Sequence, residues 1–375
     1  MKSGKFSGVN CVSSTLQDRI HATPASEIKT EATPPPAEKM KPSIDPNIAA
    51  MIQEMTRINL RAHLSNNEVE DVLRKLIAHL ADSAKYISFL MGLVKRTHAG
   101  TSNIFGEQQM QLDVFADEVL RQRLADESSF GVAEFASEEQ GHILILRNNG
   151  EEYSITVDPL DGSSRIRANG TVGTIIGIHR RPIISQRPAR ASMVGAMYVV
   201  YGPLTTLVYS VGKGVHEFVL DQAGNFLLST ENITMPEKGS LYSPGGQRSE
   251  WNPTHAAFIS QLEERGYKLR YSGALVPDFH QLLLEGGGIF SYPALKKAAN
   301  GKLRLLFEAQ PLAFIAEQAG GAATNGEVDI LDFAATDLDQ RCPFYIGSKH
   351  EVAEAARFFA ADRWTSIQNR AAVAA

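Results

Sequence analysis

The sequence predicts a layered α/β (α+β) fold, in which an N-terminal sheet unit is followed by a smaller C-terminal α/β unit. Three observations lead to this prediction. Residues 48–96 have a helical pattern, residues 142–221 contain short apolar segments divided by turn residues, and helical and strand-like segments alternate after Pro236. Elements that are apolar on one face bury that face against another layer, so we expect stacked α and β layers.

The N-terminal unit is expected to start with helices. In segment 66–96 apolar residues recur close to a 3.6-residue period from Val69 onward, and a second helix is expected over Gln108–Asp126. Strands are expected next, because short apolar runs are separated by Gly, Asn and Pro. These runs cover residues 142–147, 153–158, 171–180, 192–202, 205–212 and 214–221.

The C-terminal unit is expected to alternate helices with strands. The segments with helical character are 255–266, 277–287, 311–321 and 350–362. Those with strand character are 268–273, 288–294, 302–307 and 343–348. We therefore expect domains at 47–235 and 236–375, preceded by a separate segment at 1–46.

Residues 1–46 are rich in Ser, Thr, Ala and Pro and carry too few apolar residues for a core, so a disordered extension is expected. The only cysteines are Cys11 and Cys342, and this usage favours a reducing compartment and a cytoplasmic location. Basic residues with few acids at the start of the chain leave a transit peptide for the chloroplast or another plastid as the alternative.

Composition excludes several classes of partner. The chain has 375 residues, of which 43% are hydrophobic, and this is enough for one large core or two packed domains. The formal net charge of −5 argues against a nucleic-acid partner, which would favour a basic surface. No segment reaches the roughly 18 apolar residues of a membrane span, so no membrane partner is expected. An acidic protein that acts on polyanions needs a metal or a local positive patch.

The segment VDPLDGSS at 157–164 has the pattern of a metal and phosphate site. Asp158 ends an apolar strand, Pro159 is expected to end the strand pairing, and Asp161 follows in a turn. Both carboxylates can face one point there, and hard cations such as Mg²⁺ choose oxygen ligands. Gly162, Ser163 and Ser164 offer backbone N–H groups and hydroxyls to a phosphate. The alternative is an Asx turn with a helix N-cap.

Other acidic residues stand at similar positions. Glu138 and Glu139 lie between strand-like segments, Asp113 lies on a predicted helix, and Glu308 follows an apolar run. Taken singly, they are equally consistent with a solvated loop, a surface helix and a helix cap. Together they predict a cluster that needs cations, since gathered carboxylates repel one another. Two metals could hold the attacking water and the leaving oxygen of an in-line displacement.

Several motifs resemble the class I fructose-1,6-bisphosphatase family in order and spacing, over roughly residues 50–362. They are GEQQMQLDVFADEVL, SEE, DPLDGSS with TVGTIIGI, RYSGALVPDFHQ, GGIFSYPA and GKLRLLFEAQPLAFIAEQAGGAATNG. The resemblance implies a sugar phosphatase fold, with a homodimer or homotetramer as the assembly. It also implies two or more Mg²⁺ ions in each active site, with Mn²⁺ as a substitute.

The resemblance also implies roles for individual residues. The residues that correspond to metal ligands are Glu138, Glu139, Asp158, Leu160 through its carbonyl, Asp161 and Glu308. The implied catalytic residues are Asp113, Glu138 and Glu107, although the family has Asp at position 107. The residues that correspond to the substrate site are Gly162, Ser163, Ser164, Arg270, Tyr271, Tyr292, Lys297 and Lys302. Arg270 corresponds to a residue that reaches into a neighbouring subunit.

Within the family, the motifs YGPLTT, YSPGGQR, LRYSGALVPD and RLLFEAQPL are more similar to sedoheptulose-1,7-bisphosphatases. Fructose bisphosphatases usually carry Asn-Glu-Gly where this chain has Pro244 to Arg248, and Arg248 could take over a contact with the distal phosphate. The first expectation is therefore hydrolysis of sedoheptulose 1,7-bisphosphate to sedoheptulose 7-phosphate and phosphate.

GGIFSYPALKKAANGKLRLL and TDLDQRCPFYIGS are similar to the fructose enzymes. A fructose-1,6-bisphosphatase, or an enzyme that accepts both sugars, is therefore the alternative, in gluconeogenesis or the Calvin cycle. An inositol phosphate phosphatase and a non-catalytic metabolite sensor are more distant alternatives.

Two departures from the family concern regulation. Residues 97–103 contain no cysteine, where plant-type sedoheptulose bisphosphatases carry a redox-active pair. The family members that AMP inhibits have Lys-Tyr on a strand, whereas this chain has Glu152 and Tyr153. An acid facing a nucleotide phosphate is unfavourable, so weak or absent AMP inhibition is expected.

Overall fold

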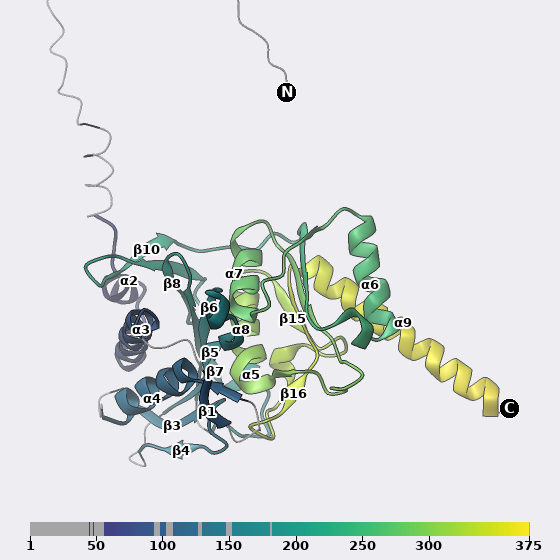
Figure 1. The fold of residues 1–375 in the computed structure, drawn as a ribbon, viewed down its shortest axis with the longest axis horizontal. Helices are drawn as coiled ribbons and strands as arrows, with labels where there is room; N and C mark the ends of the chain where they lie inside the picture. Colours follow the sequence, from purple (N-terminus) through teal and green to yellow (C-terminus); the bar gives the residue numbers. More distant parts are fainter. Residues whose placement is uncertain are drawn as a thin grey trace, which may run out of the picture. The chain divides into compact units, whose positions relative to one another are not determined.

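In the described part of the chain, the two larger β-sheets alternate with layers of helices (Figure 1). The computed structural model describes residues 45, 48, 56–93, 98–102, 108–126, 130–147, 152–180 and 182–374. Residues 54–375 form one unit, to which the following description applies. The predicted extension at 1–46 falls almost wholly outside the described residues, and the predicted boundary at 235/236 stays a prediction.

The large sheet has eight strands in the order β10-β9-β8-β7-β6-β5-β3-β4. Neighbouring strands are antiparallel except β3 and β5, which are parallel. The bounds of these strands are β3 Val132–Ser137, β4 Leu144–Ile145, β5 Tyr153–Asp161, β6 Val172–Arg180, β7 Met193–Tyr201, β8 Thr205–Ser210, β9 His216–Leu220 and β10 Phe226–Thr230.

The small sheet has five strands in the order β12-β11-β13-β17-β15. Their bounds are β11 Leu241–Pro244, β12 Lys268–Leu269, β13 Gly288–Tyr292, β15 Ala322–Thr324 and β17 Phe344–Gly347. Two further strand pairs lie outside the sheets: β1 (His98–Ser102) with β2 (Gln108–Met110), and β14 (Leu303–Arg304) with β16 (Arg341–Cys342).

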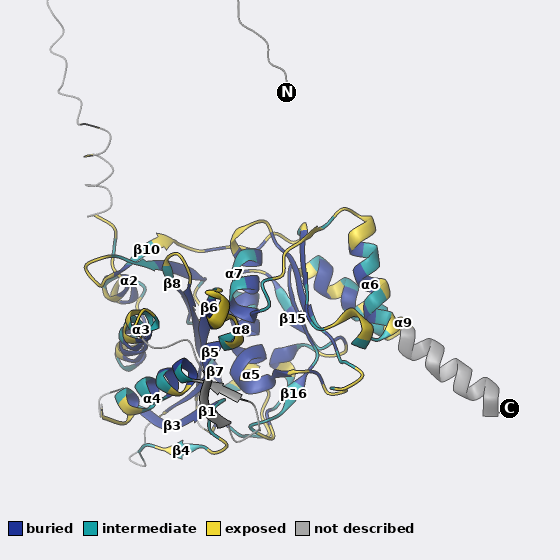
Figure 2. Cartoon of the chain, viewed as in Figure 1, coloured by how far each residue is buried: buried dark blue, intermediate teal, exposed yellow. Residues whose placement is uncertain are grey.

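Three apolar cores separate the layers. The helices are α2 Leu60–Asn66, α3 Asp71–Met91, α4 Gln111–Asp126, α5 Ala189–Ser192, α6 Pro253–Glu264, α7 Leu275–Leu284, α8 Gln310–Gln318 and α9 Lys349–Ala374. One core lies between α2–α4 and the large sheet, a second between the two sheets around α7 and α8, and a third between the small sheet, α6 and α9 (Figures 1 and 2). The order is helix, sheet, helix, sheet, helix.

Strand β7 shows why its sequence is apolar at nearly every position. Ala196 and Tyr198 face the core between the sheets, whereas Met197 and Val199 face the core under α2–α4. Side chains alternate between the faces of a strand, so a strand with helices on both sides is apolar throughout. The predicted layered fold is confirmed.

Several element boundaries differ from the sequence predictions. The predicted helix at Gln108–Asp126 starts at Gln111, because the three preceding residues pair with β1. Strands β3, β10 and β11 were not predicted as separate elements. The predicted strand at 302–307 is only two residues long, and a π-helical turn at Leu305–Ala309 follows it.

Pro159 does not end β5, contrary to the sequence prediction. The strand continues to Asp161, and its pairing with β6 shifts register between Asp158 and Asp161. A bulge of this kind accommodates a proline, which has no N–H for the ladder. Thr174 Oγ1 donates to the Pro159 carbonyl oxygen at 2.8 Å. The bulge therefore keeps the two carboxylates on a continuous strand.

Candidate active site

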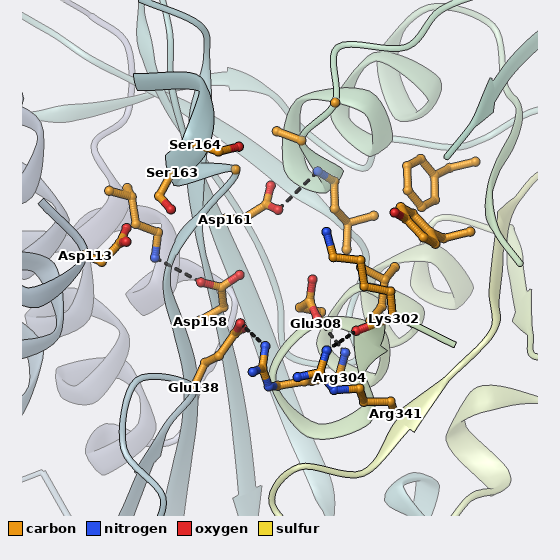
Figure 3. Close-up of a pocket in the computed structure, with 18 of the residues that line it drawn as sticks. Asp113, Glu138, Asp158, Asp161, Ser163, Ser164, Lys302, Arg304, Glu308 and Arg341 are labelled. Carbon is orange, nitrogen blue, oxygen red and sulfur yellow. Dashed lines mark hydrogen bonds and ion pairs between the residues drawn. The ribbon is translucent and has the colours of Figure 1, made fainter. Parts of the chain in front are cut away.

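One cavity collects acidic side chains from four separate stretches of the chain (Figure 3). Its volume of about 260 Å³ is several times the roughly 30 Å³ of a water molecule, so small solutes can enter. The lining residues that carry charge or hydroxyl groups are Asp113, Glu138, Glu139, Asp158, Asp161, Ser163, Ser164, Tyr271, Tyr292, Lys302, Arg304, Glu308 and Arg341. Leu160 and Gly162 also line it.

Three carboxylates meet at the base of this cavity. Oxygen atoms of Glu138, Asp158 and Glu308 all lie within 4.8 Å of one another. Asp158 and Glu308 are buried, with 6% and 7% of their surface exposed. The backbone N–H of Glu138 donates to the Val157 carbonyl oxygen at 2.9 Å, which places the residue after β3 beside β5. Parallel pairing of β3 and β5 thus brings two of the three acids together.

The bulge in β5 directs Asp158 and Asp161 to different partners. The Leu160 N–H donates to Asp158 Oδ1 at 3.0 Å, which is an Asx turn. Asp161 accepts from the N–H groups of Leu275 and Val276 at 3.1 and 2.6 Å, at the N-terminus of α7. The predicted Asx turn is present, whereas the 3₁₀ helix that follows has no side-chain cap, and Asp161 instead caps α7 from outside that helix.

Burial makes ionisation of these acids costly. Burial raises the pKa of Asp161 to about 7, although the two N–H groups of α7 oppose this shift. Burial, followed by the charges of Glu138 and Asp161, raises the pKa of Asp158 well above its ordinary value. The positive charge that ionised carboxylates need in this position has to come from neighbouring groups or from cations.

Glu308 reaches the cavity from the π-helical turn Leu305–Ala309, which leads directly into α8. The widened turn differs from the α-helix that follows it, and such turns are frequent at functional sites. The Arg304 N–H donates to Glu308 Oε2 at 2.6 Å. Burial raises the pKa of Glu308, while this N–H and the Arg304 charge lower it.

A short 3₁₀ helix at Ser163–Ala168 begins at the cavity. Gly162 precedes it with φ of 76°, a left-handed conformation that favours glycine. A Cβ at this position would lie 2.3 Å from the Ala274 Cβ, so glycine also allows the close approach of the segment before α7. Ser163 and Ser164 follow with their hydroxyls and N–H groups beside the acids.

A basic group lines the cavity beside these acids. Arg304 and Arg341 are paired neighbours on β14 and β16, and Lys302 precedes β14 (Figure 3). Arg304 is buried and forms ion pairs with Glu138 and with Asp339. Neither arginine is predicted from the sequence pattern. The available signal for Arg304 is a basic residue inside the apolar run LRLLF, which a buried element accepts only when the charge is paired.

The structure brings together most of the predicted substrate residues but not all. Tyr271, Tyr292 and Lys302 line the cavity, and Lys302 Nζ lies 5.8 Å from the centre of the Tyr292 ring. The remaining three predicted basic residues do not line it: Arg248, Arg270 and Lys297. Glu107 lies outside the described residues.

Two of these outlying basic residues, Arg248 and Lys297, have other neighbours. Arg248 lies 3.7 Å from a Glu263 carboxylate oxygen and over the Trp251 ring. Lys297 is 86% exposed and lies 3.5 Å from Glu250. Both side chains are thus paired with acids that do not line the cavity.

The carboxylate trio fits a divalent cation. Its donors are all oxygens, and they converge from three elements to within 4.8 Å. Hard cations such as Mg²⁺ and Mn²⁺ prefer this donor set. A cation also offsets the burial and the neighbouring negative charges that together raise the pKa of Asp158. Glu138, Asp158 and Glu308 are the residues that would hold it.

Comparison with known proteins decides the family. The model of the fructose-1,6-bisphosphatase N-terminal domain matches residues 53–231, and the model of the C-terminal domain matches residues 235–360. The chain belongs to the fructose-1,6-bisphosphatase family. It is a phosphoric monoester hydrolase of the sugar bisphosphatase class, with the metal dependence of this family.

Curated members of the fructose-1,6-bisphosphatase family are similar along nearly their whole length. The class 1 fructose-1,6-bisphosphatase of Pelobacter propionicus is 48% identical over 303 residues, which cover 80% of this chain and 93% of the relative. The class 1 enzyme of Geobacter sulfurreducens is 46% identical over 303 residues, covering 80% of this chain and 96% of the relative.

Solved structures of the family share the fold. The holo form of Leishmania major fructose-1,6-bisphosphatase has a TM-score of 0.75 and 35% identity, covering 81% of this chain and 99% of that one. A putative sedoheptulose-1,7-bisphosphatase of Toxoplasma gondii has a TM-score of 0.74 and 31% identity, with the same coverage. The family fold predicted from the sequence motifs is therefore confirmed.

Proposed function

We propose that this enzyme hydrolyses the 1-phosphate ester of fructose 1,6-bisphosphate in the presence of Mg²⁺. The observation that carries the proposal is the convergence of Glu138, Asp158 and Glu308 in one cavity with the basic group of Lys302, Arg304 and Arg341. A bisphosphate needs both halves of such a site. One phosphate reacts beside cations held by the acids, and the other is held by basic side chains.

The acids would hold two or more Mg²⁺ ions, with Mn²⁺ as a substitute. When bound, such ions polarise the phosphoryl group and make the attacking water more acidic. Glu138, Asp158 and Glu308 supply the converging oxygens, and Glu139, Asp161 and the Leu160 carbonyl are further donors. Arg304 also holds Glu138 in place through their ion pair.

The remaining residues of the cavity orient the reactants. We assign Asp113, together with Glu138 and Glu107, to orientation and deprotonation of the attacking water. Ser163 and Ser164, with the N–H groups of the 3₁₀ helix, face the reacting phosphate. The residues proposed to contact the sugar and its distal phosphate are Tyr271, Tyr292, Lys302 and Arg341. Each acts by positioning, which dominates catalysis of phosphoryl transfer.

Sedoheptulose 1,7-bisphosphate is the second candidate substrate. The segment Pro244 to Arg248 supports it, because it replaces the Asn-Glu-Gly typical of fructose enzymes. The structural similarity to a putative sedoheptulose bisphosphatase also supports it. The names of the curated relatives are fructose-1,6-bisphosphatases, so they favour the alternative of the sequence analysis over its first choice.

Steady-state kinetics with both sugar bisphosphates in Mg²⁺ test this proposal. We expect kcat/KM to be at least about tenfold higher for fructose 1,6-bisphosphate, a difference of about 1.4 kcal/mol in transition-state binding. Equal kcat/KM values for the two sugars would show that the enzyme has dual specificity. A tenfold preference for the seven-carbon sugar would overturn it. Inositol monophosphate serves as the negative control.

We also propose a homodimer or homotetramer in which Arg270 serves the neighbouring subunit. Arg270 does not line the cavity of its own chain, although the adjacent Tyr271 does. Its guanidinium donates to the Leu269 carbonyl oxygen at 2.9 Å and is exposed. Mixing Arg270→Ala subunits with inactive Asp158→Asn subunits should restore part of the activity if the arginine acts across an interface. Activity of the mixture that is no higher than the activity of the separate variants would refute this role.

The compartment stays an expectation from the sequence. A cytoplasmic location is our proposal, and the curated relatives give no support to a plastid. In the part of the chain that the structure describes, no helix is both long and apolar enough to span a bilayer.

A further inference from the structure

A second group of metal-ligating side chains lies at the other end of the large sheet. His63 of α2, His216 at the start of β9 and Glu231 just after β10 bring ring nitrogens and a carboxylate oxygen within 4.8 Å of one another. None of the three lines the catalytic cavity. Strands β8, β7 and β6 separate β9 from β5, which is about 19 Å at ~4.8 Å per strand.

The hydrogen bonds of the two imidazoles determine which nitrogen carries a lone pair. The side-chain amide of Asn67 donates to the His63 carbonyl oxygen at 3.0 Å, and the same Nδ2 lies 3.1 Å from His63 Nε2. The amide group is therefore turned toward His63. In the Nδ1–H tautomer, His63 donates to the Tyr209 hydroxyl at 2.8 Å, and Nε2 has a lone pair that can accept from Asn67 or bind a cation.

His216 shows the same division of roles. The Asn232 N–H donates to His216 Nδ1 at 3.3 Å, so Nδ1 has the lone pair. His216 Nε2 therefore donates to the Lys213 carbonyl oxygen at 3.1 Å. Metal-binding histidines typically donate their second ring N–H to such an oxygen, which fixes the tautomer and the ring orientation. Burial lowers the pKa of His216 and keeps the ring in the neutral form that a metal requires.

A carboxylate faces one of these lone pairs. Glu231 Oε1 lies 3.1 Å from His63 Nε2, a nitrogen that can also accept from Asn67. A proton on Nε2 bridges these two atoms as a hydrogen bond, and a metal cation bound between them would take the place of that proton. The imidazoles are almost fully buried, at 2% and 3% exposure, whereas the Glu231 side chain is 49% exposed and leaves a path to solvent.

We propose that His63, His216 and Glu231 form a zinc site distinct from the catalytic centre. Two imidazoles and one carboxylate match the ligands of Zn²⁺, and the fourth position is left to water. This donor set disfavours Mg²⁺, which takes oxygen ligands. The ion would tie α2 to β9 and to the end of β10, so it would stabilise the packing of the first helix on the sheet.

Zinc retention by the full-length protein tests this site. The chelator-treated protein is dialysed against micromolar Zn²⁺ in excess Mg²⁺, and bound zinc is measured by atomic emission. We expect the parent to retain about one more zinc ion per chain than His216→Gln or Glu231→Gln. The exposed His142, which lies outside the cluster, provides His142→Gln as a matched control with unchanged retention. Repeating the series in an Asp158→Asn background separates this site from the catalytic acids.

Two further measurements keep the proposal testable if a ligand variant folds poorly. Tyr209→Phe preserves the ring but removes the hydroxyl that orients His63, and it should lower zinc affinity by about 10- to 100-fold. Co²⁺ in place of Zn²⁺ should give the intense visible absorption of a four-coordinate site in the parent. Equal zinc retention in the parent and His216→Gln, or only the weak spectrum of an oxygen-ligated six-coordinate ion, would overturn the proposal.

Discussion

At the scale of single residues, the charges of Asp158 and Asp161 link stability to metal binding. Both carboxyls are buried, and both have a raised pKa. A raised pKa means that the folded protein keeps a proton that the unfolded chain releases. Metal-free stability therefore decreases as the pH rises from the unfolded pKa near 3.8 to the folded pKa, which is about 7 for Asp161. Cations bound at high pH replace those protons.

The pH dependence of the magnesium effect follows from these charges. The difference in Tm between the protein in Mg²⁺ and the protein in EDTA should grow from about pH 5 to about pH 8, because more carboxylates are then ionised. Asp158→Asn should reduce this growth, since the variant has one charge fewer to neutralise. Differential scanning calorimetry at several pH values measures both effects. A Tm difference that is constant or decreases with pH would contradict this role of the acids.

Two lysines provide a matched pair for the substrate site. Lys302 lines the cavity, whereas Lys297 is 86% exposed and does not. Lys302→Met should lower kcat/KM by about 10- to 150-fold, the equivalent of about 1.5–3 kcal/mol for a hydrogen bond to a charged group. Lys297→Met should change it less than about threefold. Equal losses in the two variants would show that Lys297 also reaches the substrate, for instance after a movement of its loop.

At the scale of elements, regular periodicity predicts well and irregular segments do not. The apolar pattern from Val69 predicts α3, and the apolar runs between turns predict strands β5 to β9. The bulge at Pro159 and the π-helical turn around Glu308 are set by tertiary contacts that no local pattern expresses. Both irregular elements carry cavity carboxylates, so sequence reasoning fails where the local structure serves the site.

Alanine substitutions at two glycines distinguish the cost of backbone strain from the cost of overpacking. Gly162 and Gly212 have φ of 76° and 84°, but a Cβ meets Ala274 only at Gly162 and finds nothing within 4 Å at Gly212. Alanine at either position should lower the free energy of unfolding by about 1–3 kcal/mol, because it must adopt a left-handed backbone conformation. Gly162→Ala should cost about 1–3 kcal/mol more through overpacking, and it should also lower kcat. Urea unfolding measures the free energies, and equal values for the two variants would contradict the close approach.

Weak or absent AMP inhibition is expected from the groups at the start of β5 and the end of β6. Arg180 forms ion pairs with Glu152 and, at 3.8 Å, with Glu70, and the Tyr153 hydroxyl donates to Glu70 at 2.8 Å. The basic and phenolic groups of this surface are thus already paired with acids, which repel a nucleotide phosphate. AMP at millimolar concentration should leave kcat/KM unchanged within about twofold. Strong inhibition with a sigmoidal AMP response would show that these pairs rearrange.

At the scale of the whole molecule, the layered arrangement makes one site from distant segments. Helix α7 begins beside Asp161, which accepts from the Leu275 and Val276 N–H groups, α8 begins after Glu308, and both helices pack between the sheets. The acids at strand ends were predictable because apolar runs precede them in the sequence. Arg304 and Arg341 were not, because their pairing across β14 and β16 joins stretches that lie far apart in the sequence. The placement of Arg248 and Lys297 outside the cavity likewise depends on tertiary structure.

Phosphate release by Asp158→Asn is the most direct test of the account. Asp158 lies within reach of the other acids of the cavity and is one of the three carboxylates that would hold the cation. The variant should therefore lose at least about 10³-fold in kcat with fructose 1,6-bisphosphate and Mg²⁺. The exposed Glu264 gives Glu264→Gln as a control that removes an acid elsewhere and should keep full activity. A folded Asp158→Asn protein with the activity and Mg²⁺ dependence of the parent would contradict a carboxylate-held metal centre.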